Sequence, residues 1–345
     1  MRASFHALTL VFWLVSLPAV GVEYTWTQVT EAAVFCQRDG AGAATYDGKM
    51  WLLGGWADDP AGASGHVGYN DVWNTTDGLN WTQVRPNTPN TPGVWDGRHC
   101  GGYVVFNNKM WIVGGDPLLK HYQNDVWNSA DGVNWQQVTA NAPWGQRNLH
   151  VTMVHDGKIW VMGGQTVPQY VPGVPEAFYN DVWNSSDGVN WTQVTAHAAW
   201  SPRGMIQGSV EFQGRMWLLG GGTYDTPAHP TRLFYNEVWS SADGVNWRKE
   251  AVAPWAPRQY HSVAVFDDKM WVMAGGNSST PGYNRNDVWY SSDGVNWTEL
   301  PDTPWPTRHA GTAFVYDGHL WMVAGSHPGS TPINDVWRLD TIHAP

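Results

Sequence analysis

Three side chains that are close in the sequence have the types needed for acid–base chemistry on an acidic ligand. Arg258, Tyr260 and His261 form the densest polar cluster of the chain. Tyrosine and histidine serve as general acid and base in enzymes, and the planar guanidinium group of arginine matches a carboxylate. Tyr260 and His261 are therefore the catalytic candidates. The alternative is that both are hydrogen-bonding wall residues near a channel.

Arg258 belongs to a motif that recurs six times, in which an aromatic residue precedes an arginine by three positions. The pairs are Phe35/Arg38, Trp95/Arg98, Trp144/Arg147, Trp200/Arg203, Trp255/Arg258 and Trp305/Arg308. Six such arginines around the mouth of a channel would bind an anionic ligand, with the tryptophan rings as platforms. The alternative is a set of structural ion pairs, because a long arginine side chain can largely cover the ~9–10 Å between alternate strands. The acidic partners would be Asp71, Asp125, Asp181, Glu237, Asp287 and Asp335.

Residues that differ between the repeats indicate a site better than residues that all repeats share. The position after the arginine is occupied in turn by Asp39, His99, Asn148, Gly204, Gln259 and His309. Polar loop residues add His121, Tyr122, Tyr170, Glu176, Tyr224, Asp225, His229 and Arg232. The predicted ligand-binding set is Arg38, Arg98, Arg147, Arg203, Arg258, Arg308, His99, His150, His309 and Tyr224.

These residues recur because the chain repeats one unit made of two hairpins. Residues 179–194, YNDVWNSSDGVNWTQV, are a strand, a polar turn and a second strand. The Asp-Gly pair suits this turn because it tolerates the positive φ of tight hairpins. The first strand of this hairpin, NDVW or NEVW, begins at Asn70, Asn124, Asn180, Asn236, Asn286 and Asn334.

The inner hairpin of each unit contains an apolar strand that ends in small residues, such as MWLLGG from Met50. Continuous apolar character predicts a strand that is covered on both faces. Its tryptophan recurs near the ~50-residue period of a propeller blade. We therefore predict an all-β fold, a six-bladed β-propeller with four antiparallel strands per blade. The last NDVW lacks its partner strand, and WTQV stands at residues 26–29, so an N-terminal strand should complete the last blade and close the ring.

The pattern resembles the kelch repeat, in which a double glycine such as Gly54-Gly55 is followed by paired aromatic residues such as Trp73 and Trp81. The resemblance implies a kelch-type propeller of the galactose-oxidase central-domain superfamily. Galactose oxidase holds copper through tyrosine and histidine, but nothing in this sequence specifies that set, so no metal or other cofactor is predicted. Some periplasmic sialic-acid epimerases resemble the same architecture. SSDGVNW is similar to the aspartate box of sialidase propellers, a structural turn.

Strand direction alternates through a blade, so the long, varied loops between its second and third strands share a face with the connections between blades. The other face carries only short, uniform turns. A rigid scaffold with variable loops on one side usually carries function there. We therefore predict a binding or interaction module that uses the loop-rich face, with an anionic or neutral carbohydrate or an extracellular protein as ligand. The alternative is an enzyme acting on an acidic sugar, an epimerase or a polysaccharide lyase.

Composition limits the remaining possibilities. A net charge of −11 argues against non-specific nucleic-acid binding. Residues 1–21 predict a signal peptide, with Arg2, an apolar run over 7–17 and small residues at 19–21; an uncleaved anchor or a buried strand is the alternative. The propeller would span residues 22–345 as a secreted, or in a bacterium periplasmic, monomer with no membrane span after signal cleavage. Cys36 and Cys100 either form a disulfide or are two free thiols.

Overall fold

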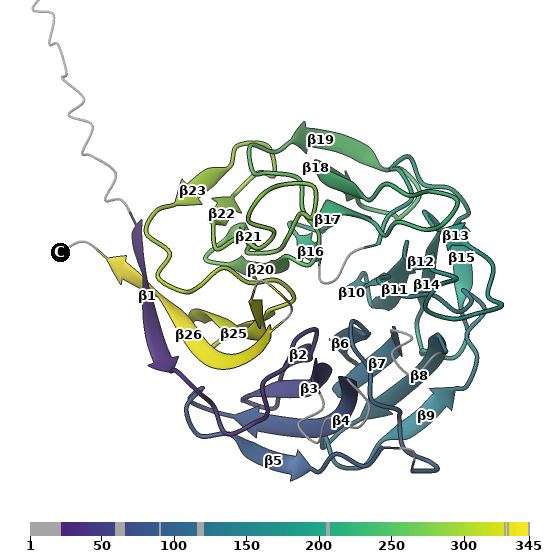
Figure 1. The fold of residues 1–345 in the computed structure, drawn as a ribbon, viewed down its shortest axis with the longest axis horizontal. Helices are drawn as coiled ribbons and strands as arrows, with labels where there is room; N and C mark the ends of the chain where they lie inside the picture. The colour runs from purple at the N-terminus through teal and green to yellow at the C-terminus, as the bar shows by residue number, and fades with distance from the viewer. Residues whose placement is uncertain are drawn as a thin grey trace, which may run out of the picture.

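The protein is a ring of six sheets in the computed structural model, which describes residues 22–343 except 59–65, 90, 116–120, 205–207, 328 and 330. Each sheet has four antiparallel strands and stands as a blade around a central axis (Figure 1). This confirms the predicted fold class. The predicted signal peptide lies outside the described residues. Within those residues, no helix has the length and apolar character needed to cross a membrane.

The blades follow one another along the chain, and the innermost strands of neighbouring blades contact each other around the whole ring. From the inner to the outer strand, the first three blades are β2 (Gly42–Tyr46), β3 (Lys49–Asp58), β4 (His66–Thr75) and β5 (Thr82–Arg85); β6 (Gly102–Phe106), β7 (Lys109–Gly115), β8 (Gln123–Ser129) and β9 (Gln136–Thr139); and β10 (Val151–His155), β11 (Lys158–Met162), β14 (Val182–Ser185) and β15 (Thr192–Thr195). The other three are β16 (Ser209–Phe212), β17 (Arg215–Thr223), β18 (Leu233–Ser241) and β19 (Arg248–Val252); β20 (Ser262–Phe266), β21 (Lys269–Met273), β22 (Val288–Ser291) and β23 (Thr298–Leu300); and β24 (Thr312–Tyr316), β25 (His319–His327), β26 (Thr331–His343) and β1 (Val22–Thr30). A loop of the third blade adds the short pair β12 (Gln165–Thr166) and β13 (Ala177–Phe178).

The ring closes where the first strand of the chain joins the last. β1 pairs antiparallel with β26 (Figure 1). In this pairing Trp26 lies opposite Leu339. Side chains of β1 also reach the fifth blade and its connection to the sixth. The Tyr24 ring meets the Trp271 ring edge-on at 4.9 Å between centroids, and the Trp26 ring meets the Trp305 ring edge-on at 5.7 Å. The predicted closure is therefore confirmed, and β1 belongs to the packing between two blades as well as to one sheet.

The Asp-Gly turns lock each blade against the one before it. Each turn glycine lies against the tryptophan of the second strand in the preceding blade. The pairs are Gly78/Trp321, Gly132/Trp51, Gly188/Trp111, Gly244/Trp160 and Gly294/Trp217. A Cβ atom on Gly188 would stand only 2.3 Å from the Trp111 ring. The remaining tryptophan, Trp271, meets Tyr24 of β1 instead, so the seam of the ring uses an aromatic contact where the other blades use a glycine.

Replacing Gly188 with alanine should lower the free energy of unfolding by about 2 kcal/mol, because overpacking against Trp111 adds to the cost of a positive φ. Gly157→Ala is the matched control. Gly157 also has a positive φ, +65° against +74° for Gly188, but no atom lies within 4 Å of its added Cβ. Urea unfolding of both variants separates the two effects. Equal losses of stability would show that the contact with Trp111 contributes nothing.

Candidate functional site

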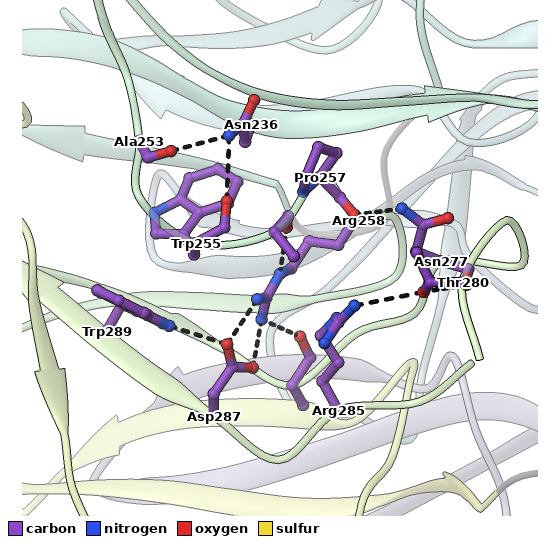
Figure 2. A network of polar contacts seen from close by, with 12 residues as sticks. Asn236, Ala253, Trp255, Pro257, Arg258, Asn277, Thr280, Arg285, Asp287 and Trp289 are labelled. Atoms are coloured by element: carbon purple, nitrogen blue, oxygen red, sulfur yellow. Dashed lines mark hydrogen bonds and ion pairs between the residues drawn. The ribbon is translucent and has the colours of Figure 1, made fainter. Parts of the chain in front are cut away.

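The six arginines of the repeated motif lie inside the blades. Each pairs with the acidic residue of its own blade, the closest N–O distances being 2.5–2.7 Å. Figure 2 shows the arrangement around Arg258. Its guanidinium donates two hydrogen bonds to Asp287, both of 2.6 Å, and one of 2.8 Å to the Ala274 carbonyl, while the Trp289 indole donates to the same carboxylate at 2.9 Å.

This geometry corresponds to the ion-pair alternative. The arginine side chains are at most 2% exposed, and each is met by a carboxylate and by a carbonyl at the end of the apolar strand. A ligand at the channel mouth would contact none of these guanidinium groups. The residues concerned, all placed in the predicted binding set, are Arg38, Arg98, Arg147, Arg203, Arg258 and Arg308.

His261 and His150 connect neighbouring blades. The Nε2 atom of His261 lies 2.8 Å from the Leu219 carbonyl oxygen of the preceding blade, and His150 makes the equivalent contact with Val113 at 2.9 Å. Burial, with a further contribution from Arg258, lowers the pKa of His261 to about 3. The His261 imidazole is thus buried and neutral, and it does not join Tyr260 in an open site. His150 lines an inner cavity of the central channel.

Replacing His261 with glutamine should make the protein less sensitive to acid. The folded-state pKa of His261 lies below the ordinary value of ~6.5, so the unfolded chain takes up a proton at a higher pH than the folded protein. The neutral imidazole therefore contributes its full stability above pH ~6.5, and this stability is lost as the pH falls toward 3. A glutamine amide can still donate to the Leu219 carbonyl but does not titrate. Between about pH 6 and 4, the wild-type free energy of unfolding should fall more steeply than that of the variant, by up to about 1.4 kcal/mol per pH unit. Urea titrations across this range test this, and parallel curves would contradict it.

A cavity of about 220 Å³ lies on the loop-rich face, at the channel mouth. All six blades contribute to it, through the connections that enter the innermost strands and through the loops between second and third strands. Its lining is Asp39, Trp56, His99, Tyr170, Tyr224, Arg232, Tyr260, Tyr283 and His309. We refer to these nine residues as the mouth pocket.

An apolar layer forms the floor of the mouth pocket. Cys100, Leu149, Tyr260 and Ala310 come from four different blades and pack together across the axis. All four have φ between 51° and 58°, an uncommon conformation for residues other than glycine. Gly40 shares it, with φ +56°, and a Cβ there would stand 2.1 Å from the His99 ring. The absence of a side chain at Gly40 therefore leaves the space that His99 occupies.

Aromatic rings form a continuous wall. The ring of Tyr170 meets that of Tyr224 at 5.7 Å between centroids, and Tyr224 meets Tyr260 at 6.1 Å. His309 continues the series, 5.6 Å from Tyr260 and 5.4 Å from Tyr283. The hydroxyl of Tyr260 is buried and has no hydrogen-bond partner among the described residues. Buried polar groups normally have a partner, so this hydroxyl is an exception beside the pocket.

Charged and hydrogen-bonding groups stand at two places in the mouth pocket. On one side, Asp39 lies between two imidazoles, with Oδ1 at 3.2 Å from His99 Nε2 and Oδ2 at 3.8 Å from His309 Nε2. On the other, Arg232 stacks on the Tyr224 ring at 4.5 Å and forms an ion pair with Asp225 at 2.5 Å.

In the described residues, no three side chains of histidine, cysteine, aspartate or glutamate are grouped to hold a metal ion. Cys36 is exposed and Cys100 is buried, and they do not form a disulfide.

The structure thus brings together only part of the predicted site. His99, His309, Tyr224 and Tyr260 share the mouth pocket, whereas His150, His261 and the six arginines do not. The pocket residues that sequence reasoning did not single out are Trp56 and Tyr283. Trp56 lies near the end of β3 and Tyr283 in the loop between β21 and β22. Neither belongs to a pattern that recurs in the other blades, so no periodic signal marked them.

Comparisons with known proteins support the architecture. No protein-family model matches the chain. It is 34% identical over 138 residues to a curated Drosophila melanogaster protein, the leucine-zipper-like transcriptional regulator 1 homolog; the match covers 37% of this chain but only 13% of that protein. A solved structure described as the structure of YjhT is similar with a TM-score of 0.63 and 16% identity, over 87% of this chain and 94% of that one. At this identity the likeness shows the propeller fold alone.

Proposed function

We propose that this protein is a secreted, kelch-type binding module that recognises a small carbohydrate in the mouth pocket. The observation that carries the proposal is a cavity to which all six blades contribute, with an aromatic wall beside a few polar groups. Small-molecule sites are concave, mostly apolar and aromatic, and contain a few placed polar groups that fix orientation. Sugars suit such a site because a ring of C–H groups packs on an aromatic face while its hydroxyl groups form hydrogen bonds.

The size of the mouth pocket favours a single sugar ring. Its volume of about 220 Å³ is below the ~300–1,000 Å³ typical of sites for drug-sized ligands. A monosaccharide, or the terminal unit of a longer chain, matches this volume. A longer chain would extend outward from the channel, because the apolar layer of Cys100, Leu149, Tyr260 and Ala310 underlies the pocket.

Binding is favoured over catalysis on an acidic sugar by the positions of the two catalytic candidates. Tyr260 lines the mouth pocket, but His261 faces the Leu219 carbonyl and is buried. Arg258, the residue predicted to bind the carboxylate of the sugar, is already paired with Asp287. The proposed acid, base and anion-binding group therefore do not converge on one ligand position.

One NMR time course on residues 22–345 tests the proposal, using a panel of neutral, amino and acidic monosaccharides. We expect saturation transfer to a bound sugar without new product signals. Tyr283→Ala should abolish the transfer, and Val189→Ala, an exposed change on the opposite face, should leave it intact. Product signals would instead establish an enzyme. Absence of transfer from every sugar would reject carbohydrate binding and leave an extracellular protein as the ligand.

A further inference from the structure

Asp39 differs from the other buried aspartates of the described chain. Asp71, Asp181 and Asp335 are each paired with an arginine. Asp39 is only 1% exposed but has two histidines as neighbours and no arginine. Burying a carboxylate without a cationic partner costs free energy. In the six ion pairs an arginine offsets this cost, whereas at Asp39 other groups must do so.

One carboxylate oxygen of Asp39 lacks a well-aligned hydrogen bond from any described residue. Oδ2 accepts a hydrogen bond from the Ser326 hydroxyl. Oδ1 accepts no well-aligned hydrogen bond within the described residues, although His99 Nε2 stands 3.2 Å away. Burial lowers the pKa of His309, against the attraction of Asp39, so near neutral pH the uncharged form of this imidazole is favoured. An uncharged His309 does not neutralise the Asp39 carboxylate on the wall of the mouth pocket.

The one strongly basic residue of the mouth pocket does not cancel this potential. Arg232 is held against Asp225 at 2.5 Å, and the two charges compensate each other. Its guanidinium also stacks on Tyr224. The remaining wall is aromatic, and aromatic faces attract cations through their quadrupoles. Asp39 and the aromatic ring faces therefore both favour a positively charged ligand.

We propose that the mouth pocket selects a sugar that carries a protonated amino group over the same sugar with a neutral or an acidic group. This inference rests on the proposed carbohydrate-binding function and names its ligand class. In this arrangement the ammonium group lies on the Asp39 side of the pocket, where the buried carboxylate attracts it, and the sugar ring packs on the tyrosines. Six exposed arginines would instead select an anionic ligand.

Four matched monosaccharides test the inference: D-glucosamine, N-acetyl-D-glucosamine, D-glucose and D-glucuronate. Calorimetric or NMR titrations at about pH 6 keep an ordinary amine protonated. We expect D-glucosamine to bind at least about tenfold more tightly than D-glucose, which corresponds to ~1.4 kcal/mol, and D-glucuronate to bind most weakly. Equal affinities, or a preference for D-glucuronate, would overturn the inference while leaving carbohydrate binding intact. Failure of all four sugars to bind would reject the proposed function and this inference with it.

Two variants locate the preference. Asp39→Asn keeps the shape of the side chain and removes its charge, so it should abolish the preference for D-glucosamine over D-glucose. Its melting curve and NMR spectrum establish that it is folded. Arg232→Gln provides a second measurement should Asp39→Asn not fold, and it should retain or increase the preference. Persistence of the preference in a folded Asp39→Asn variant, or its loss in Arg232→Gln, would contradict the assignment.

Discussion

Deletion of residues 22–30, which form β1, is expected to abolish the cooperative folding of the whole ring instead of fraying its last blade. The deletion removes the Tyr24 contact with Trp271 and the Trp26 contact with Trp305. It also exposes the edge of β26, a strand of 13 residues, and long unpaired edges promote aggregation. Removing a large buried aromatic side chain costs about 3–5 kcal/mol. Two such losses, even partial ones, are comparable to the ~5–15 kcal/mol stability of a typical domain.

Circular dichroism, urea unfolding and size-exclusion chromatography test this expectation. The double variant Tyr24→Ala/Trp26→Ala should lose much of the same stability while retaining the strand. Thr25→Ala/Gln28→Ala is the matched control, because both residues of β1 are exposed, and it should unfold close to the wild-type midpoint. A truncated protein that is monomeric and melts at the wild-type temperature would show that β1 is dispensable.

Replacing Arg258 with alanine should lower the free energy of unfolding by about 3 kcal/mol. Breaking a buried ion pair typically costs roughly 3–5 kcal/mol because the remaining charge is left without a partner. We expect the lower end of this range, since the Asp287 side chain is 22% exposed and can be partly hydrated. The Ala274 carbonyl also loses its hydrogen bond from Arg258. Because Arg258 does not line the mouth pocket, ligand affinity should change little.

The double variant Arg258→Leu/Asp287→Leu is the control for the unpaired charge. Exchanging both members of a buried pair for apolar residues is often close to neutral, so this protein should be more stable than Arg258→Ala. Melting temperature and sugar affinity are measured on both. If Arg258→Ala kept its stability and lost its ligand, the arginines would be binding residues and the ion-pair interpretation would be wrong.

The fold could be predicted because nearly every residue of the repeated NDVW motif has a packing role that all six blades share. In the fifth blade, Asn286 donates to the Trp305 carbonyl in the connection to the next blade, and Asp287 accepts from Arg258. Val288 is fully buried, and Trp289 donates back to Asp287. Requirements that recur six times leave a periodic pattern in the sequence, and a periodic pattern of strands and turns determines the propeller.

The site could be predicted only in part, for the same reason. The mouth pocket is built from residues that differ between blades, so Tyr283 and Trp56 left no repeated signal. His309 and His99 were identified because their position, directly after the arginine, could be compared across repeats. The sequence could not distinguish an exposed guanidinium from a buried one, because this depends on whether Asp287 lies within reach of Arg258 across two strands. Similarly, only the three-dimensional structure shows that His261 faces the Leu219 carbonyl.

The seam between β1 and β26 has a consequence for the covalent order of the blades. Val22 lies opposite His343, so the two strand ends stand where the other five blades have an Asp-Gly turn. A circular permutant that joins residue 343 to residue 22 through such a turn, and that opens the chain at the exposed turn around Asp187, would keep every strand neighbour. Loop tips of this kind tolerate new termini. The chain could therefore begin and end in any blade. The mouth pocket requires only that the six blades form a closed ring.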